Sequence, residues 1–197
     1  MDLTRITPDT TALRALAHPM RMRILGLLRN DGPSTATALA ARLDLNSGAT
    51  SYHLRQLAQH GFVEDDPDNG KGQGNGRDRW WRAAHQATVH QEKPDASLAE
   101  REASDAFGQA VAIVHTELLQ HALEERSFMP AEWRRASTMS DWGIRLTPEH
   151  AYELVHAIEQ LVEGWDEDGE DVAGTEQFMV VLDAYPRPGQ IAPADPS

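Results

Sequence analysis

Apolar residues recur every three or four positions through the N-terminal third of the chain, the spacing that gathers them on one face of an α-helix. These runs predict four helices, over residues 10–17, 19–30, 35–43 and 47–59. Asp9 can cap the first helix, and Pro19 can begin the second, where a proline loses no hydrogen bond. Gly61 follows the fourth helix at the position of a C′ glycine, so the fourth helix should end just before it.

The pattern changes after Gly61. Residues 62–64 and 79–83 predict two short strands, and the stretch between them, DPDNGKGQGNGRD, holds four glycines. The segment therefore predicts a β-hairpin with a long irregular tip. Because neighbours on a strand face opposite ways, one of Trp80 and Trp81 should be buried.

The second half of the chain predicts longer helices. Residues 84–96 are polar and are expected to be a linker, and the capping-box sequence at 97–100 then opens a long helix. The apolar stripe of this helix consists of Phe107, Ala110, Val111, Val114, Leu118 and Ala122. Residues 147–165 predict the most clearly amphipathic helix, and residues 178–182 predict a strand.

The order of these elements predicts the fold class. Short helices, a tight turn into a further helix and a glycine-tipped hairpin are the order of a winged helix-turn-helix. We expect a mainly α-helical protein with a small β-hairpin wing. Residues 1–90 would form the winged helix-turn-helix DNA-binding domain, residues 91–185 an acidic, mostly helical dimerisation or effector domain, and residues 186–197 a disordered tail.

Charge is distributed unevenly over these parts. The net charge is −13, yet residues 10–90 carry ten Lys and Arg against seven Asp and Glu, a net +3. Residues 91–197 carry seven Lys and Arg against 22 Asp and Glu, a net −15. Such asymmetry indicates two regions with different partners. The negative total is therefore a property of the C-terminal half.

Composition excludes several classes of site and compartment. Without cysteine, the chain has no disulfide, no thiolate metal site and no cysteine nucleophile. The first residues lack the apolar run of a signal peptide, and no stretch approaches the length needed to span a bilayer. We therefore expect a soluble, cytoplasmic protein that does not associate with membranes.

The helix at 47–59 carries the candidate DNA-reading face. Thr50, Leu54 and Leu57 form its apolar stripe and should face the core, which leaves the opposite side free to enter the major groove of DNA. The expected DNA-contacting residues are Ser47, Gly48, Ala49, Ser51, Tyr52, His53, Arg55, Gln56 and Gln59 of this helix and Lys71, Gln73, Arg77 and Arg79 of the hairpin.

The hairpin tip has a second reading, as a glycine-rich nucleotide-binding loop. The spacing of its glycines disfavours that reading, because it matches neither a P-loop nor a strand-loop-helix setting. Four acids, Asp65, Asp66, Asp68 and Asp78, weaken the wing as a clamp on phosphates.

Two stretches carry a family resemblance. ALAHPMRMRILGLLR followed by ALAARLDLNSGATSYHLRQLAQHGFVE resembles the arsenic-repressor (ArsR) type of winged-helix regulator, over about residues 10–85. LTPEHAYELVHAIEQLVEGW leading to FMVVLDAYPRP resembles the tail of a subgroup with an extended C-terminal region. The chain departs from the family's best-known metal sensors because it lacks their cysteine pair.

The resemblance implies a homodimeric repressor or activator that reads a palindromic operator. It places Ser47, Gly48, Ser51 and Tyr52 at positions that often contact bases, and the wing on phosphate or the minor groove. Dimerisation is expected to use the first helix and the stripe of Phe107, Val111, Val114 and Leu118.

Other functions remain open at this level. Glu117, His121 and Glu124 or Glu125 share a helix face, as do Glu153 and His156, but solvated faces rich in Glu and His explain these spacings better than a metal site. We expect no metal, no cofactor and no catalytic residues, since no catalytic motif is present. The alternatives are a winged-helix protein-interaction module and a sensor of an unidentified small molecule or metal.

Overall fold

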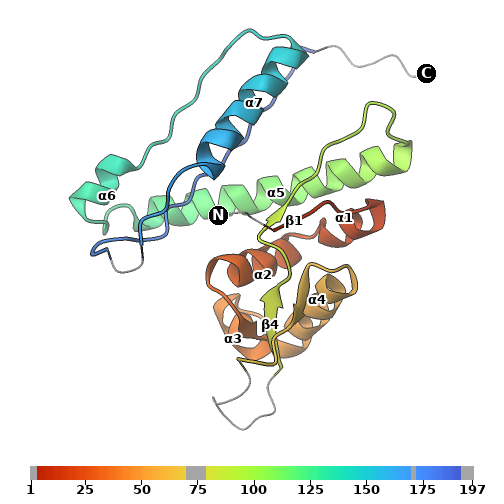
Figure 1. Cartoon of the computed structure of the whole chain (residues 1–197), viewed down its shortest axis with the longest axis vertical. Coiled ribbons are helices and arrows are strands. Elements are labelled where there is room, and N and C mark those ends of the chain that lie inside the picture. Colours follow the sequence, from red (N-terminus) through yellow and green to blue (C-terminus); the bar gives the residue numbers. More distant parts are fainter. Residues whose placement is uncertain (1–3, 70–78, 170–171, 192–197) are drawn as a thin grey trace. The chain divides into compact units, whose positions relative to one another are not determined.

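The computed structural model describes residues 4–69, 79–169 and 172–191. The chain divides into two compact units, Met1–Phe128 and Met129–Ser197. The elements of the first unit are β1 (Arg5–Ile6), α1 (Thr10–Leu16), α2 (Pro19–Asn30), β2 (Ser34–Thr35), α3 (Ala36–Arg42), α4 (Ser47–Gln59), β3 (Val63–Asp65), β4 (Trp80–Ala83), β5 (Ala87–Thr88) and α5 (Leu98–Glu125) (Figure 1).

Side-chain caps fix where the short helices begin. The Asp9 carboxylate accepts from the backbone N–H of Ala12 at 2.8 Å and begins α1, and Asn46 caps α4 in the same way. Gly61, at φ +75°, follows α4 in the left-handed conformation that glycine adopts without a steric penalty. The four helices predicted in this region are confirmed, and α4 has the predicted bounds.

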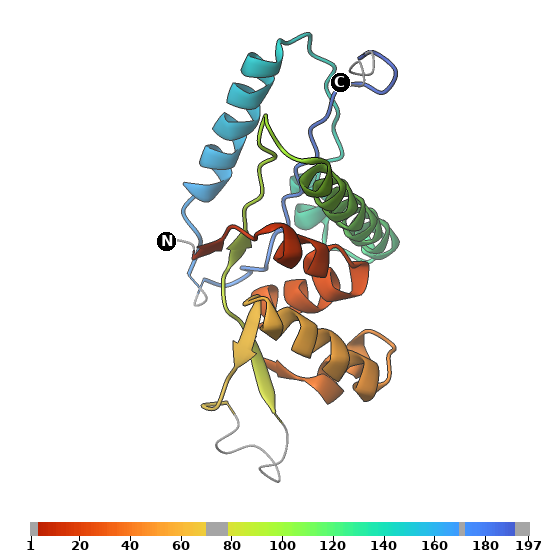
Figure 2. The ribbon, with the colours of Figure 1, turned by 90° about the vertical axis from the view of Figure 1, so that its right-hand side faces the viewer.

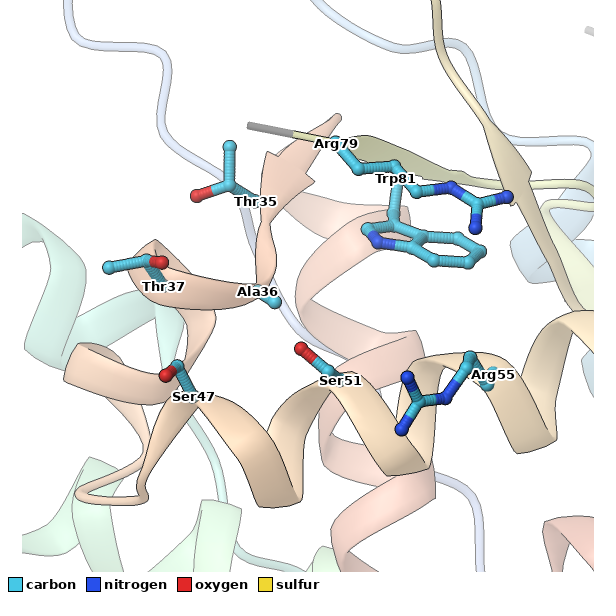
Figure 3. A pocket seen from close by; sticks show the side chains of 8 residues that line it. All are labelled: Thr35, Ala36, Thr37, Ser47, Ser51, Arg55, Arg79 and Trp81. Carbon is cyan, nitrogen blue, oxygen red and sulfur yellow. The ribbon is translucent and has the colours of Figure 1, made fainter. Parts of the chain in front are cut away.

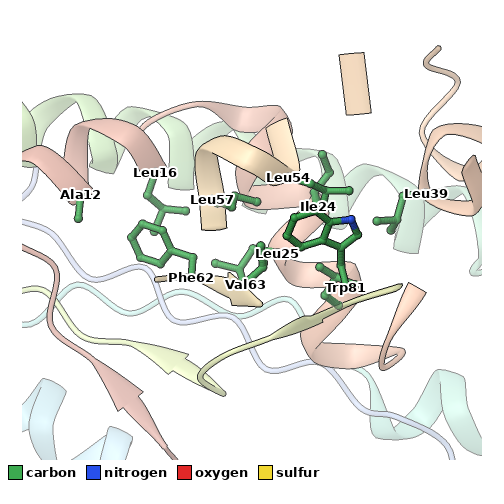
Figure 4. Close-up of a cluster of buried hydrophobic side chains, with 11 residues drawn as sticks. Ala12, Leu16, Ile24, Leu25, Leu39, Leu54, Leu57, Phe62, Val63 and Trp81 are labelled. Atoms are coloured by element: carbon green, nitrogen blue, oxygen red, sulfur yellow. The ribbon is translucent and has the colours of Figure 1, made fainter. Parts of the chain in front are cut away.

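The core of the first unit lies between α1, α2, α3, α4 and the wing strands (Figure 4). Leu54 and Leu57 of α4 are fully buried there, and Phe62 closes the cluster just after the helix. Thr50 completes the predicted inward stripe, with its hydroxyl donating to the carbonyl of Asn46 at 3.2 Å. Burial of this stripe determines which side of α4 remains available to a partner.

The wing is an antiparallel sheet with strand order β2-β4-β3. Ser34 lies opposite Trp81 on one side of β4, and Glu64 lies opposite Arg82 on the other. Trp81 is 4% exposed while Trp80 is half-buried, which confirms that one of the two tryptophans is buried. Strands β3 and β4 extend together away from the helices (Figure 2, yellow and yellow-green). The fold is therefore the predicted one, mainly helical with a small β-hairpin wing.

The segment predicted as a linker contains an ordered connection. Within it, β5 pairs in parallel with β1, Ala87 lying opposite Arg5. The largely buried guanidinium of Arg29 holds this segment from α2, donating to the carbonyl of His85 and to Oγ1 of Thr88, each at 2.9 Å. Burial lowers the pKa of Arg29 to about 10, which still leaves it charged at neutral pH. Two contacts with distant parts of the chain therefore order part of the segment predicted as a linker.

The long helix α5 belongs to the first unit. Ala103 and Ala110 are buried where it packs against α1 and α2, and the small side chains allow close approach of the helices. Nε of Arg23 on α2 donates to Glu117 of α5 at 2.7 Å, at the far end of the same contact. The compact unit therefore extends well beyond the boundary predicted at residue 90.

The second unit contains α6 (Ala131–Ala136) and α7 (Pro148–Glu163), the latter capped by Thr147 as predicted. The ring of Trp133 stacks on Phe178 with centroids 6.2 Å apart. None of its described residues is buried, and the apolar residues of α7 are largely exposed. The strand predicted at residues 178–182 is wrong, because no described strand lies beside this segment to pair with its backbone.

No helix in the described ranges has the length and apolar character needed to cross a membrane. The last six residues of the predicted disordered tail lie outside the described residues.

The core contacts predict a large difference between two leucine truncations. Leu57→Ala should lower the free energy of unfolding by about 2–5 kcal/mol, because it leaves a cavity among fully buried side chains. Leu161→Ala is the control, since this leucine is 62% exposed on α7 and should change the value by less than about 0.5 kcal/mol. Urea denaturation followed by circular dichroism measures both. Equal effects would contradict the placement of α4 in the core.

Candidate nucleic-acid interface

Helix α4 presents one polar face to solvent. Tyr52 is 52% exposed, and Arg55 and Gln59 are exposed beside it, one helical turn apart. Asn46 satisfies the N–H of Ala49 at 2.8 Å at the start of the helix. The exposed face therefore begins at a well-formed helix terminus and continues for the whole length of α4.

A pocket of about 270 Å³ lies between α4 and the wing (Figure 3). Ser47, Ser51 and Arg55 line one side from successive turns of α4. The facing residues come from the start of α3 and from β4 and the residue before it, namely Thr35, Ala36, Thr37, Arg79 and Trp81. The pocket thus joins the two elements that the sequence predicts to touch DNA.

The predicted DNA-contacting residues differ in their placement. Exposed on the first unit are Ser47, Gly48, Tyr52, Arg55, Gln59 and Arg79. Half-buried are Ala49, Ser51, His53 and Gln56. Lys71, Gln73 and Arg77 lie outside the described residues. The structure brings Ser47, Ser51, Arg55 and Arg79 together around one pocket.

Sequence reasoning missed the contribution of α3. Thr35 caps this helix by accepting from the backbone N–H of Ala38 at 3.1 Å, and Thr37 lies next to it on the pocket wall. The sequence contained an indication of this contribution, because two threonines at the start of the helix that precedes α4 supply hydroxyls beside a helix N-terminus. Helices in this position contact the DNA backbone in helix-turn-helix proteins.

Acidic neighbours hold the arginines of the wing. Nε of Arg79 donates to Asp65 at 3.0 Å, and its guanidinium carbon lies 4.1 Å from the centroid of the Trp81 ring (Figure 3). On the other face of the sheet, Nε of Arg82 donates to Glu64 at 2.8 Å. The side chains of both pairs are about half exposed, so solvent screens them.

Arg55 differs from these arginines. It lies on the exposed face of α4 at the pocket, and in the described part of the chain no acid or carbonyl holds its guanidinium. A guanidinium without an internal partner keeps all its donors for a ligand. Arg55 is therefore the group best placed to form a bidentate contact from α4.

A cluster of basic rings lies where α4 meets the start of α2. The rings of His18 and His53 have centroids 4.9 Å apart, and Tyr52 contacts the second ring edge-on at 5.6 Å. Nδ1 of His53 and Nε of Arg21 are buried without a hydrogen-bond partner. His53, predicted to contact DNA, thus lies against His18 and does not line the pocket.

This environment favours neutral imidazoles. Burial, followed by the charge of Arg21, lowers the pKa of His18. Burial, followed by the nearby His18 and Arg21, lowers the pKa of His53. His18 has a further reason to remain neutral, because its Nδ1 accepts from the backbone N–H of Met20 at 3.1 Å and caps α2. A proton on that nitrogen would abolish the cap.

The predicted dimerisation stripe lies mostly against its own chain. Phe107 packs on the core of the first unit and meets His90 edge-on, with ring centroids 5.9 Å apart. Val111 and Val114 are half-buried, and Leu118 is 40% exposed. The exposed large apolar residues of α5 are Leu98, Ile113, Leu118, Leu119 and Leu123.

Two of the residues weighed as metal ligands form other contacts. Glu117 pairs with Arg23, and His156 interacts with Gln160 at 3.0 Å and Glu159 at 3.7 Å. Within the ranges described by the structure, no three His, Asp or Glu side chains gather as a set of ligands.

Comparison with protein families matches residues 16–66 to a family described as a helix-turn-helix domain. This stretch runs from the end of α1 through α4 to the residue after β3. A search of curated proteins finds no match. The matching description and the fold together support a DNA-binding transcriptional regulator.

Two solved structures of bacterial proteins are similar to the chain. One is a mutant of ZitR from Lactococcus lactis in its apo form, 15% identical over 73% of this chain and 81% of that chain, with a TM-score of 0.30. The other is a mutant MarR from E. coli, 15% identical over 72% of this chain and 75% of that chain, with a TM-score of 0.29.

The histidine cluster predicts a loss of stability in acid. Unfolded histidines, with pKa values near about 6.5, take up protons that the folded His18 and His53 resist. The free energy of unfolding should therefore be highest above about pH 6.5 and fall as the pH is lowered towards about 5.

His18→Asn tests the cause, because asparagine can still cap α2 but does not titrate. This variant should lose less stability between these pH values than the wild type in urea denaturation. His156→Asn, at an exposed position of α7, should behave as the wild type. An identical pH dependence in all three proteins would rule out His18 as its source.

Proposed function

We propose that this chain is a sequence-specific transcriptional regulator of the ArsR type that binds a palindromic operator as a homodimer. The observation that carries the proposal is the pocket in which Ser47, Ser51 and Arg55 of α4 face Arg79 of the wing. Hydroxyl and guanidinium groups at one helical face, next to an extended hairpin, suit simultaneous contact with base edges and backbone.

Helix α4 is the proposed reading element. A helix fits the major groove, where each base pair shows a distinct pattern of donors and acceptors. The unpartnered guanidinium of Arg55 can donate two hydrogen bonds to O6 and N7 of a guanine, the commonest specific contact. Tyr52 and Gln59 extend the same exposed face, and the small Gly48 allows the helix N-terminus to approach the DNA closely.

The wing and the start of α3 are the proposed backbone contacts. Thr35, Thr37 and Arg79 all lie on the side of the pocket that faces α4. Contacts to phosphate position a protein on the duplex without reading sequence. Lys71, Gln73 and Arg77 are proposed to extend this contact along the hairpin tip.

A homodimer would supply the second reading helix. One helix covers a few base pairs, and dimers of helix-turn-helix proteins bind two half-sites about 34 Å apart. Because Phe107 packs on the core and Val114 is half-buried, we place the dimer contact on the exposed side of α5, at Leu119 and Leu123. These two leucines lie one turn apart, as a seam between helices requires.

A second function, a winged-helix module that binds protein and not DNA, is favoured by one observation. Asp65 and Glu64 pair with two wing arginines, which reduces the positive charge that DNA binders usually present. The two functions differ in their response to salt and in the role of Arg55, so one series of measurements separates them.

Arg55→Ala should weaken operator binding by about 1–3 kcal/mol if the side chain reads a base. The operator can be obtained by selecting duplexes from a random library with the wild-type protein, and binding followed by fluorescence anisotropy. Arg101→Ala, which removes an exposed arginine from α5, is the matched control and should retain wild-type affinity. Failure to enrich any duplex at low salt would refute DNA binding, and equal affinities would refute the reading face.

Leu119→Asp should convert the dimer to a monomer, because it places a charge within the proposed apolar seam. Multi-angle light scattering measures the mass directly. Tyr52→Asp is the control, since it makes a similar change at an exposed aromatic residue on α4 and should leave the dimer intact. A monomeric wild type, or a dimer that survives Leu119→Asp, would contradict this interface.

A further inference from the structure

We infer that Asp65 is a selectivity residue, which offsets the charge of Arg79 at the edge of the pocket and thereby suppresses binding to DNA of arbitrary sequence. The inference rests on the proposed function, because it concerns the same interface. It assigns a task to an acid that would otherwise weaken a DNA-binding surface.

The geometry joins Asp65 to the arginine nearest the reading helix. Asp65 ends β3 directly opposite Trp81, which is buried beneath the pocket. Oδ1 of Asp65 accepts from Nε of Arg79 at 3.0 Å while the guanidinium lies over the Trp81 ring. Arg79 is thus held between a carboxylate and an aromatic face on the wall that faces Arg55.

The pair is weak enough for DNA to compete with it. Both side chains are more than half exposed, and exposed ion pairs contribute only about 0–1 kcal/mol. A phosphate can therefore take over donors of Arg79, but the carboxylate remains beside it and repels the phosphate. Sequence-independent affinity for DNA depends on such phosphate contacts, so it falls. Contacts of α4 with base edges do not involve Asp65 and keep their strength.

The neighbouring acid has a different role, which makes the assignment specific to Asp65. Asp66 is buried, and its carboxylate accepts from the backbone N–H groups of Asp68 and Asn69 and from the side chain of Asn69. These hydrogen bonds, that of the Asn69 side chain above all, lower the pKa of Asp66. Asp66 shapes the turn that leaves β3, whereas Asp65 faces an arginine at the surface.

Other arginines of the first unit are also held by acids. The pairs are Arg14 with Glu102, Arg23 with Glu117, Arg42 with Asp31 and Arg82 with Glu64. Since Arg55 is without such a partner, the charge left free at the pocket lies on the helix that reads sequence. This distribution favours specific contacts over general attraction to the duplex.

Asp65→Asn tests the inference, because asparagine keeps an oxygen to accept from Arg79 but removes the charge. The probe is a mixed-sequence duplex, measured by fluorescence anisotropy between about 50 and about 200 mM salt. The variant should bind this duplex more tightly at low salt than the wild type. Its affinity should also fall about threefold more over this salt range, as expected for one added phosphate contact.

Glu102→Gln is the matched control, because it too removes one negative charge from the ion pair of an exposed arginine, Arg14, which lies on α1 and not on the wing. It should leave binding close to wild type. Combining Arg79→Ala with Asp65→Asn should abolish the gain in affinity for the mixed-sequence duplex. Arg79→Ala alone should change this affinity less than Asp65→Asn does. Thermal denaturation of each variant verifies that the fold is intact.

The outcomes separate this inference from the proposed function. A gain in Asp65→Asn that Arg79→Ala removes would establish the assignment. In a second outcome, the wild type binds its operator while Asp65→Asn shows no gain in affinity for the mixed-sequence duplex, or no more than Glu102→Gln shows. That result would overturn the role of Asp65 and leave the proposed function standing. If neither protein binds any duplex at low salt, both are overturned.

Discussion

The buried indole of Trp81 is the contact on which the arrangement of the interface depends. Its strand, β4, pairs with β2 before α3 and with β3 after α4, so one residue is fixed from both sides. The ring joins the core cluster that contains Leu54 and Leu57, and its outer face carries Arg79. Helix α4, helix α3 and the wing all meet the core cluster to which this side chain belongs.

Ion pairs between arginines and acids join several elements of the first unit. Five of its described arginines pair with acids from other parts of the unit, such as Arg23 with Glu117 on α5 and Arg79 with Asp65 on β3. Residues of the class that a DNA-binding surface uses therefore also form contacts between elements of this unit. Among the described residues, Arg55 at the pocket has no acidic partner, so the position of a cation matters here as well as its number.

Local chemistry explains which parts of the fold could be read from the sequence. Capping by Asp9, Asn46 and Ser97, and the glycine after α4, act within a few residues, so helix ends were predictable. The pairing of β1 with β5 was not predictable from the sequence. Strands of two residues carry no periodicity, and these two strands lie far apart in the chain. The strand expected near Phe178 fails for a related reason, since β-propensity without a partner does not make a strand.

The candidate site was predictable to a similar degree. The inward stripe of α4 defined its outward face, and the structure brings four of the predicted residues to one pocket. The contact of His53 with His18 could not be foreseen, because it depends on how α2 meets α4. Ion pairs across strands depend on register in the same way, so the partner of Arg79 became clear only with the pairing of β3 and β4.

The packing of α5 bears on how such a protein can be recombined. Ala103 and Ala110 cover α1 and α2, so a chain cut at the end of the wing would expose the apolar surface that they seal. The smallest portion that could be transplanted as a working module therefore ends after α5. A foreign sensory domain would have to be fused beyond Phe128. Helix α5 would then connect the fused domain to the rest of the first unit.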